Sequence, residues 1–278
     1  MTASDAPPSL LVVDSGIGGL SVVAELRKDL PTARIAYVAD NGGFPYGALP
    51  DDMLTARMIA LVGAGIARFN PDLVVVACNT GSTIALASLR RVFDLPFVGC
   101  VPAVKWAASL TESGCFGILA TEATVRRAYL QDLIDRFAAD KTVLSHGSRK
   151  LAILAERRFR GEQVDLGEVV SEVAALTSQD GAQLMDTIVL GCTHFGFLLD
   201  ELRQAAPASI RWLDPAGAVS RRTQVVVAEL DHQGGIAADI ALFTSGAGLD
   251  AGLLLGFRPF GFVQFDLLPI SAGKPSEA

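Results

Sequence analysis

The chain has 278 residues, of which 50% are hydrophobic and 19% charged, so it has enough apolar side chains to fold into one or two globular domains. Its formal net charge of −7 argues against a nucleic-acid-binding protein and against adsorption to an anionic membrane, because both rely on clustered Lys and Arg. A small molecule is therefore the expected partner.

Short β-branched runs alternate with amphipathic stretches along the chain, a pattern typical of parallel α/β architecture. The predicted strands are Leu10–Val13, Arg34–Ala39, Leu73–Ala77, Phe97–Gly99, Phe116–Ala120, Thr187–Gly191 and Ile210–Leu213. Besides a helix that starts near Leu20, the predicted helices are Asp51–Phe69, Ser82–Val92, Val101–Ser113, Thr124–Ala138, Leu151–Arg158, Asp165–Ser178 and Ala216–Leu230.

The two halves of the chain repeat one arrangement of strand ends. A strand ending at Asp14 precedes a strand ending just before Cys78, and a strand ending near Thr121 precedes, at a similar distance, one ending just before Cys192. This suggests two related domains, although any two α/β domains share such features. If the halves face each other, the carboxyl ends of their strands meet at a cleft, and the two cysteines stand on opposite walls.

Targeting segments and metal sites are not expected. Residues Met1–Ser9 lack the basic start and apolar core of a signal peptide, and no apolar run reaches the length of a membrane span. Cys78, Cys100, Cys115 and Cys192 are far apart and form no C-x-x-C pair, which disfavours a zinc site and a disulfide framework. We expect a cytoplasmic protein with free thiols and no metal.

Cys78 and Cys192 each follow an apolar strand and precede a helical stretch. The positive end of a helix dipole favours a thiolate at such a position, and the exposed amides of the same turn can hold a carboxylate. His194 lies beside Cys192 as a proton partner. Either cysteine alone is better explained as a buried, inert side chain, which is what most lone cysteines are. Two of them at equivalent strand ends match what racemisation requires, one proton donor or acceptor for each face of a carbon atom.

Two loops contain candidate binding residues. The glycine-rich turn that starts at Asp14 and Ser15 lacks the lysine of a phosphate loop, so we interpret it as a cradle for a carboxylate. In this interpretation Asp14 either relays a proton to and from Cys78 or binds the ammonium group of the substrate. The alternative is a tight turn in which Asp14 caps the following helix. Tyr46 lies in a loop rich in Gly and Pro, where it either closes over a ligand or packs against the sheet edge.

Five blocks of the sequence stand out together: Leu11–Val22, Ala39–Asn41 with Pro45–Gly47, Ala77–Thr80, Val189–His194 and Phe243–Gly246. Over roughly Leu10 to Phe257 they resemble the signature sequences of the glutamate racemase family. They occur in the family's order and at suitable distances, and their joint occurrence is specific although each is short.

The resemblance implies two pseudosymmetric α/β domains, each with a mainly parallel sheet flanked by helices and with the active site in the cleft between them. Residues 1–98 and 209–278 would form the first domain, and residues 99–208 the second. It also implies a glutamate racemase that supplies D-glutamate for peptidoglycan, and hence for the cell wall and cell shape, without pyridoxal phosphate, another cofactor or metal. A homodimer is one alternative for its oligomeric state.

The family's site residues map onto matching positions of this sequence. Cys78 and Cys192 would be the paired acid and base, assisted by Asp14 on one side and by His194 and Glu156 on the other. The substrate contacts implied by the resemblance are Asp14, Ser15, Tyr46, Gly47, Asn79, Thr80, Thr193 and His194.

The sequence departs from the common family pattern at Gly81–Thr83 and at His146–Arg149, and the second departure bears on the position of Glu156. Another racemase of the same superfamily, acting on aspartate or a hydantoin, or a decarboxylase with one cysteine, is the nearest alternative. A protein of a different class, which binds an amino acid without turning it over, is the other.

Overall fold

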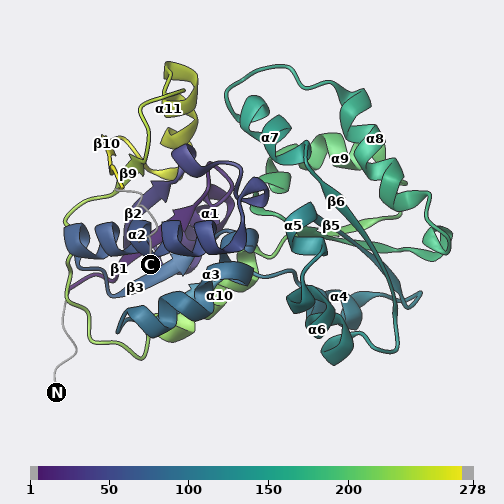
Figure 1. Cartoon of the computed structure of the whole chain (residues 1–278), viewed down its shortest axis with the longest axis horizontal. Coiled ribbons are helices and arrows are strands. Elements are labelled where there is room, and N and C mark those ends of the chain that lie inside the picture. The colour runs from purple at the N-terminus through teal and green to yellow at the C-terminus, as the bar shows by residue number, and fades with distance from the viewer. Residues whose placement is uncertain (1–5, 271–278) are drawn as a thin grey trace, which may run out of the picture. The chain divides into compact units, whose positions relative to one another are not determined.

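The computed structural model describes residues 6–270, so part of the Met1–Ser9 segment lies outside the described residues. The chain separates into two compact units, one made of the described residues up to Cys100 together with those from Ala216 onward, and the other of Val101–Pro215. Each unit contains a parallel sheet with helices packed against it (Figure 1). The predicted α/β class, with two parallel sheets flanked by helices, is confirmed.

The sheet of the first unit has the strand order β10-β9-β2-β1-β3-β4. Every residue of β1 and β3 is buried, which explains why both strands are unbroken apolar runs in the sequence. The C-terminal segment adds β9 and β10 beside β2, and neither strand was predicted. The strands are β1 (Ser9–Asp14), β2 (Arg34–Ala39), β3 (Leu73–Val76), β4 (Phe97–Gly99), β9 (Ile240–Phe243) and β10 (Phe265–Leu267).

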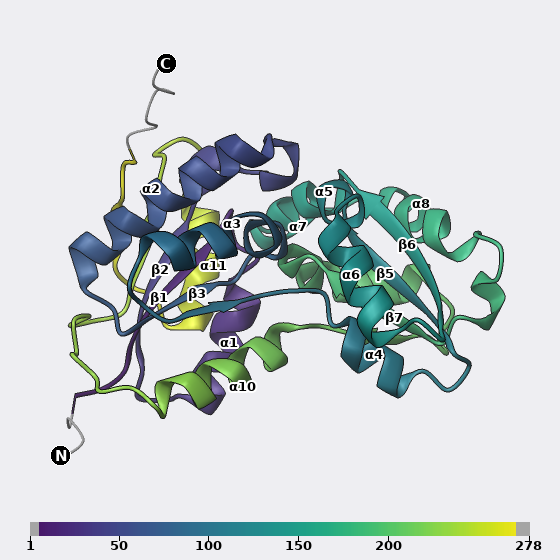
Figure 2. The same ribbon diagram turned by 60° about the horizontal axis from the view of Figure 1, so that its bottom comes forward.

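Two pairs of helices enclose this sheet. Helices α2 and α3 pack together on one face, where Leu11 and Val13 of β1 meet Met58 of α2, and α1 packs with α10 on the other (Figure 2). Helix α2 has two acidic residues in its first turn, which complement the helix dipole, and ends at Asn70 in the left-handed conformation (φ 42°). The helices are α1 (Leu20–Asp29), α2 (Asp51–Phe69), α3 (Asn79–Val92), α10 (Ala216–Val227) and α11 (Ala251–Phe257).

The sheet of the second unit has the order β6-β5-β7-β8, which repeats the β2-β1-β3-β4 order of the first. Its strands are β5 (Cys115–Thr121), β6 (Thr142–Ser148), β7 (Thr187–Gly191) and β8 (Arg211–Leu213). Strand β8 pairs with β7, so the second unit continues to Pro215, beyond the expected boundary at residue 208. In this common order β1 corresponds to β5, and β3 corresponds to β7.

The helices of the second unit differ in detail from the predicted ones. Pro102 disfavours a helical conformation at Val101, and α4 begins three residues later, at Val104. The stretch predicted as one helix from Thr124 to Ala138 consists of α5 and α6. Helices α4 and α6 cover the β5 side chains Phe116 and Ile118. The helices are α4 (Val104–Leu110), α5 (Glu122–Val125), α6 (Ala128–Phe137), α7 (Leu151–Phe159), α8 (Leu166–Thr177) and α9 (Leu199–Ala205).

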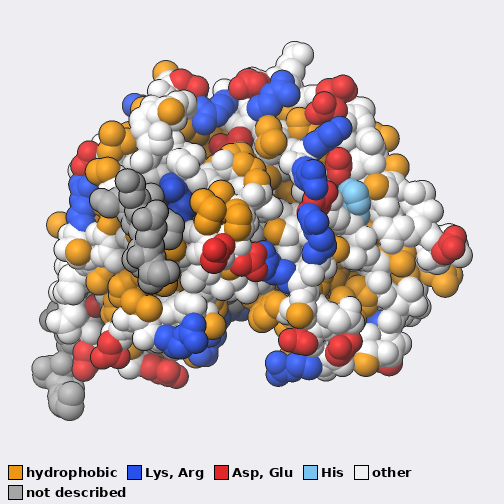
Figure 3. Space-filling view, in the orientation of Figure 1, with side chains coloured by type: hydrophobic (Ala, Val, Ile, Leu, Met, Phe, Trp, Pro, Cys, Tyr) orange, Lys and Arg blue, Asp and Glu red, His pale blue; other side chains and the backbone are white. Residues whose placement is uncertain are grey.

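The surface carries both kinds of charge. On the face shown in Figure 3, acidic and basic side chains are interspersed. Within residues 6–270, none of the helices combines the length and the apolar character needed to cross a membrane.

Candidate active site

The turn after β1 carries Asp14 and Ser15, both buried. Asp14 Oδ1 accepts a hydrogen bond from the backbone N–H of Gly16 (2.9 Å), and the hydroxyl of Tyr37 donates one to the Gly16 carbonyl (2.6 Å). Helix α1 begins only at Leu20, and no side chain caps it. The alternative in which Asp14 caps this helix is therefore wrong, and the Asp14 carboxylate instead holds the turn.

Gly19 allows the start of α1 to approach this turn closely. A Cβ atom at Gly19 would lie 2.9 Å from the Cβ of Asp14, 3.0 Å from that of Ala77 and 3.0 Å from the hydroxyl of Tyr37. Such distances are shorter than van der Waals contact, so a side chain at this position would displace Asp14.

Cys78 lies between β3 and α3 and is 6% exposed. Its backbone is extended, and its Sγ accepts a hydrogen bond from the backbone N–H of Gly81 (3.4 Å). The thiol itself therefore caps α3. An amide donor and the positive end of the helix dipole both stabilise negative charge on the sulfur.

Asn79 and Thr80, in the first turn of α3, are also buried. The Nδ2 atom of Asn79 has no hydrogen-bond partner among the described residues. Buried amide groups are nearly always paired in folded proteins, so an unpaired one marks a place where a ligand acceptor would fit.

Tyr46 is 2% exposed, and its hydroxyl donates a hydrogen bond to Asp40 Oδ2 (2.8 Å). Burial raises the pKa of Tyr46 well above its usual value, and negative charge on Asp40, Cys78 and Asp14 raises it further. Tyr46 therefore shares one electrostatic environment with Cys78 and Asp14. Because the hydroxyl hydrogen of Tyr46 is engaged, backbone groups of Tyr46 and Gly47 remain as hydrogen-bond donors for a ligand at this loop.

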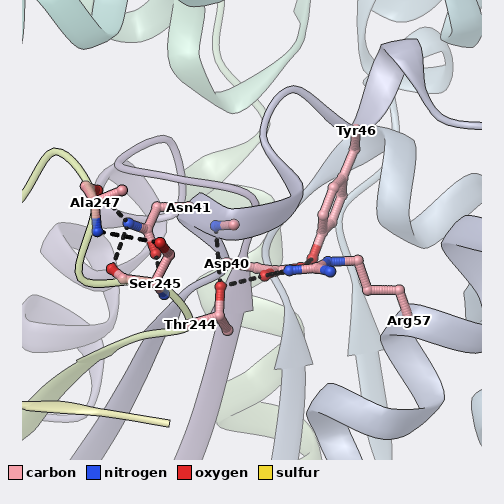
Figure 4. Close-up of polar contacts among 8 residues, drawn as sticks. Asp40, Asn41, Tyr46, Arg57, Thr244, Ser245 and Ala247 are labelled. Atoms are coloured by element: carbon pink, nitrogen blue, oxygen red, sulfur yellow. Dashed lines mark hydrogen bonds and ion pairs between the residues drawn. The ribbon is translucent and has the colours of Figure 1, made fainter. Parts of the chain in front are cut away.

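Asp40 is the centre of a network that joins the loop after β2 to the loop after β9 (Figure 4). Its fully buried carboxylate accepts hydrogen bonds from Arg57 Nε (2.6 Å), Arg57 Nη2 (2.5 Å) and Thr244 Oγ1 (2.5 Å). Next to it, Asn41 Nδ2 donates to the Ser245 carbonyl (2.8 Å). Sequence reasoning assigned no role to this network, although Ala39–Asn41 and Phe243–Gly246 were both among the blocks that carry the family resemblance.

Cys192 follows β7 and is 7% exposed. The next residues form a 3-10 helix, Thr193–Leu198, and no hydrogen bond from its amides to the Cys192 side chain caps it. The second thiol thus lacks the α-helix start that the sequence predicted. Thr193 and His194 are both 1% exposed and lie in the first turn of this 3-10 helix.

Glu156 and His194 form a pair in the second unit. Glu156 extends from α7, and its Oε1 lies 3.1 Å from Nε2 of His194. Arg160 Nη2 lies 4.0 Å from the other carboxylate oxygen. A carboxylate at this position accepts a hydrogen bond from a protonated Nε2 and so fixes the orientation of the imidazole ring.

The structure therefore groups the predicted site residues by unit. Among residues 6–270 there is no cluster of three or more His, Cys, Asp or Glu suited to a metal ion. The first unit contains Asp14, Ser15, Tyr46, Gly47, Cys78, Asn79 and Thr80, and the second contains Glu156, Cys192, Thr193 and His194.

Proteins of known function resemble this chain over both units. A family model described as Asp/Glu/Hydantoin racemase matches residues 21–223. The glutamate racemase of Granulibacter bethesdensis is 50% identical over 213 residues, 77% of this chain and 76% of that protein. The glutamate racemase of Brucella anthropi is 44% identical over 252 residues, 88% of this chain and 89% of that protein. The crystal structure of Escherichia coli glutamate racemase, in complex with L-glutamate and the activator UDP-MurNAc-ala, superposes with a TM-score of 0.90 at 39% identity and covers 95% of this chain and 99% of that one.

Proposed function

Because the chain belongs to the Asp/Glu/Hydantoin racemase family, we propose that it interconverts L- and D-glutamate by moving a proton on and off the α-carbon, with Cys78 and Cys192 as acid and base. The reaction class is supported by relatives that are 44–50% identical over most of the chain. The glutamate substrate is supported by their names and by the L-glutamate complex of the E. coli enzyme.

One observation carries the two-thiol mechanism. The two sheets share one strand order, and in each unit a buried cysteine lies within two residues of the end of the corresponding strand, Cys78 after β3 and Cys192 after β7. Packing alone gives no reason for a thiol at both equivalent positions, whereas inversion of a stereocentre requires a proton acceptor and a proton donor on opposite faces of the carbon.

On the first unit, the proposed base is the Cys78 thiolate. The α-proton of an amino acid is far less acidic than a thiol, so the base has to be desolvated and held close to the carbon. Cys78 is almost completely buried, and its sulfur accepts a hydrogen bond from the backbone N–H of Gly81, which favours the ionised form. Asp14 and Cys78 both raise the pKa of Tyr46, so they belong to one electrostatic environment, and in this proposal Asp14 relays the proton of Cys78.

The substrate carboxylate would be held by groups next to Cys78. The unpaired Nδ2 of Asn79 is a donor without an acceptor, and Thr80 and Ser15 add buried hydroxyl groups. A carboxylate gripped in this way becomes a better electron sink when the α-proton leaves, because fixed donors stabilise the developing negative charge.

On the second unit, Cys192 would exchange the other proton with help from His194. The Glu156 carboxylate fixes the imidazole ring of His194 through Nε2. Cys192 is not followed by an α-helix whose dipole would stabilise a thiolate. In this proposal the basic ring of His194 takes the role that the helix dipole has at Cys78.

In this proposal the thiols and their partners supply the whole reaction, so no pyridoxal phosphate or metal takes part. The product D-glutamate would serve peptidoglycan synthesis, and the enzyme would act in the cytoplasm. A homodimer stays a prediction, which sedimentation velocity of the purified chain tests.

Circular dichroism of each glutamate enantiomer, incubated with the purified chain in chelator-treated buffer, tests the function. The circular dichroism signal of either enantiomer should decay to zero as the racemic mixture forms. A protein that only binds the amino acid would leave the rotation unchanged and would incorporate no deuterium at the α-carbon in deuterated water. Faster turnover of aspartate or of a hydantoin would instead favour the other racemases of the family.

Serine variants test the mechanism. Cys78→Ser and Cys192→Ser should each lose racemisation in both directions, because each direction needs both thiols. With a β-chloro substrate analogue, one remaining thiolate still removes the α-proton as chloride leaves, so each variant should eliminate HCl from one enantiomer only, and from opposite enantiomers. Cys115→Ser is the control and should stay active, because Cys115 is a buried thiol that belongs to neither group of site residues. Full racemase activity in either variant, or the same enantiomer preference in both, would refute the assignment.

A further inference from the structure

The side-chain amide of Asn79 is held at one end only. Asn79 is 1% exposed, and its Oδ1 accepts a hydrogen bond from the thiol of Cys100 (S···O 3.6 Å). Its Nδ2 is buried and has no hydrogen-bond partner among the described residues. Rotation of the amide by half a turn would exchange the two ends, so whatever binds Oδ1 determines that the NH2 group points to the unpaired side.

Cys100 is well placed to hold that oxygen. It directly follows β4 and is fully buried, and its backbone N–H donates to Val76 O (3.0 Å) and to Ser82 Oγ (2.9 Å). The Ser82 hydroxyl in turn donates to Val76 O (2.9 Å). These bonds tie Cys100 to the end of β3 and the first turn of α3, so the thiol is fixed relative to Asn79. A thiol has one hydrogen to donate and a sulfur that accepts poorly, which favours the amide oxygen over the NH2 group.

We propose that Cys100 is a positioning residue of the active site: its thiol orients the Asn79 amide so that the NH2 group faces the carboxylate of the substrate. The inference rests on the proposed function, because it needs an amino-acid carboxylate as the missing acceptor. It gives a role to a third cysteine, which lies in none of the signature blocks of the sequence. The effect should be the same for both enantiomers, since both present the same carboxylate.

The test compares variants that remove or keep the donor. Cys100→Val removes the thiol hydrogen at similar volume, Cys100→Ala removes it without added bulk, and Cys100→Ser keeps a donor. We expect Val and Ala to raise KM for both glutamate enantiomers about tenfold, the size of one lost hydrogen bond, with little change in kcat. Serine should restore KM to within about threefold of the wild-type value. Cys115→Val is the matched control, because Cys115 is a buried thiol that donates to a carbonyl, Gly181 O, in the other unit.

A double-mutant cycle with Asn79→Ala separates positioning from general packing. If Cys100 acts through the amide, Cys100→Val should change KM no further once that amide is removed. Equal KM values for the Val, Ala and Ser variants and the wild type, or an undiminished effect of Cys100→Val in the Asn79→Ala background, would overturn the inference while leaving the racemase intact. Calorimetric titration with an equimolar mixture of the two glutamate enantiomers reports the same binding change without net turnover. A wild-type chain that neither racemises nor binds glutamate would overturn the proposed function and this inference together.

Discussion

Replacing Arg57 by methionine should destabilise the first unit more than replacing its partner Asp40 by asparagine. Arg57→Met keeps an apolar side chain of similar length but removes two charge-assisted hydrogen bonds from a carboxylate that is fully buried. The ionised Asp40 would then be left with the hydroxyls of Tyr46 and Thr244 as its side-chain donors. Asp40→Asn instead keeps an acceptor for one of those hydroxyls and places an NH2 group, which donates, beside the other. It also leaves an arginine that can turn towards water, since its side chain is 21% exposed.

The magnitudes follow from this difference in burial. Removing one partner of a buried ion pair costs about 3–5 kcal/mol, and the partial exposure of Arg57 puts Arg57→Met at the lower end, about 3 kcal/mol. Asp40→Asn should cost about 1–2 kcal/mol, the value of altered hydrogen bonds without a stranded charge. The double variant should be more stable than Arg57→Met alone, because it no longer buries an unpaired carboxylate.

Urea unfolding followed by far-UV circular dichroism measures these differences. For an m-value of about 2 kcal/mol/M, the Arg57→Met midpoint should fall by about 1.5 M. Arg68→Met on the same helix is the control, because its salt bridge to Asp266 is exposed and should contribute less than about 1 kcal/mol. Equal losses for Arg57→Met and Asp40→Asn, or a double variant whose loss is the sum of both, would refute the reasoning.

Two further predictions concern the second unit. Burial raises the pKa of Asp186, but hydrogen bonds from the Ser113 amide and other donors outweigh it and lower the pKa to about 2. Because the folded-state pKa lies below the unfolded value of about 3.9, the stabilisation is complete above that value and is lost as the pH falls through about 2. Asp186→Asn should therefore lower the free energy of unfolding by about 1 kcal/mol at pH 7, after allowance for solvent screening, and by much less near pH 2. Urea titrations at both pH values measure this difference, and equal losses at the two would contradict the prediction. Glu156→Gln should lower kcat/KM about tenfold by releasing the His194 ring. The equilibrium constant keeps that loss equal in both directions, so the distinguishing measurement is the α-deuterium isotope effect, which should rise for one enantiomer only; a rise for both would count against the pairing.

The features that could be predicted from the sequence are those with a local cause. Strands β1 and β3 are buried on both faces, so they are continuous apolar runs whose ends are visible in the sequence. A thiol directly after such a strand can therefore be located at the carboxyl edge of a parallel sheet without a structure, as Cys78 and Cys192 were. Strand β6 escaped this reasoning because it is an edge strand, mostly only partly buried, with polar residues such as Ser145 and His146 in its second half.

Contacts between distant segments were decided only by the tertiary structure. Asp40 bonds to Thr244, which lies more than 200 residues away, because β9 pairs with β2, and nothing near either residue in the sequence encodes that pairing. The orientation of the Asn79 amide similarly depends on Cys100, brought beside it because β4 pairs with β3. Composition and spacing indicate which side chains can perform the chemistry, whereas the hydrogen bonds that set their charge and direction form only after the sheet has brought remote strands together.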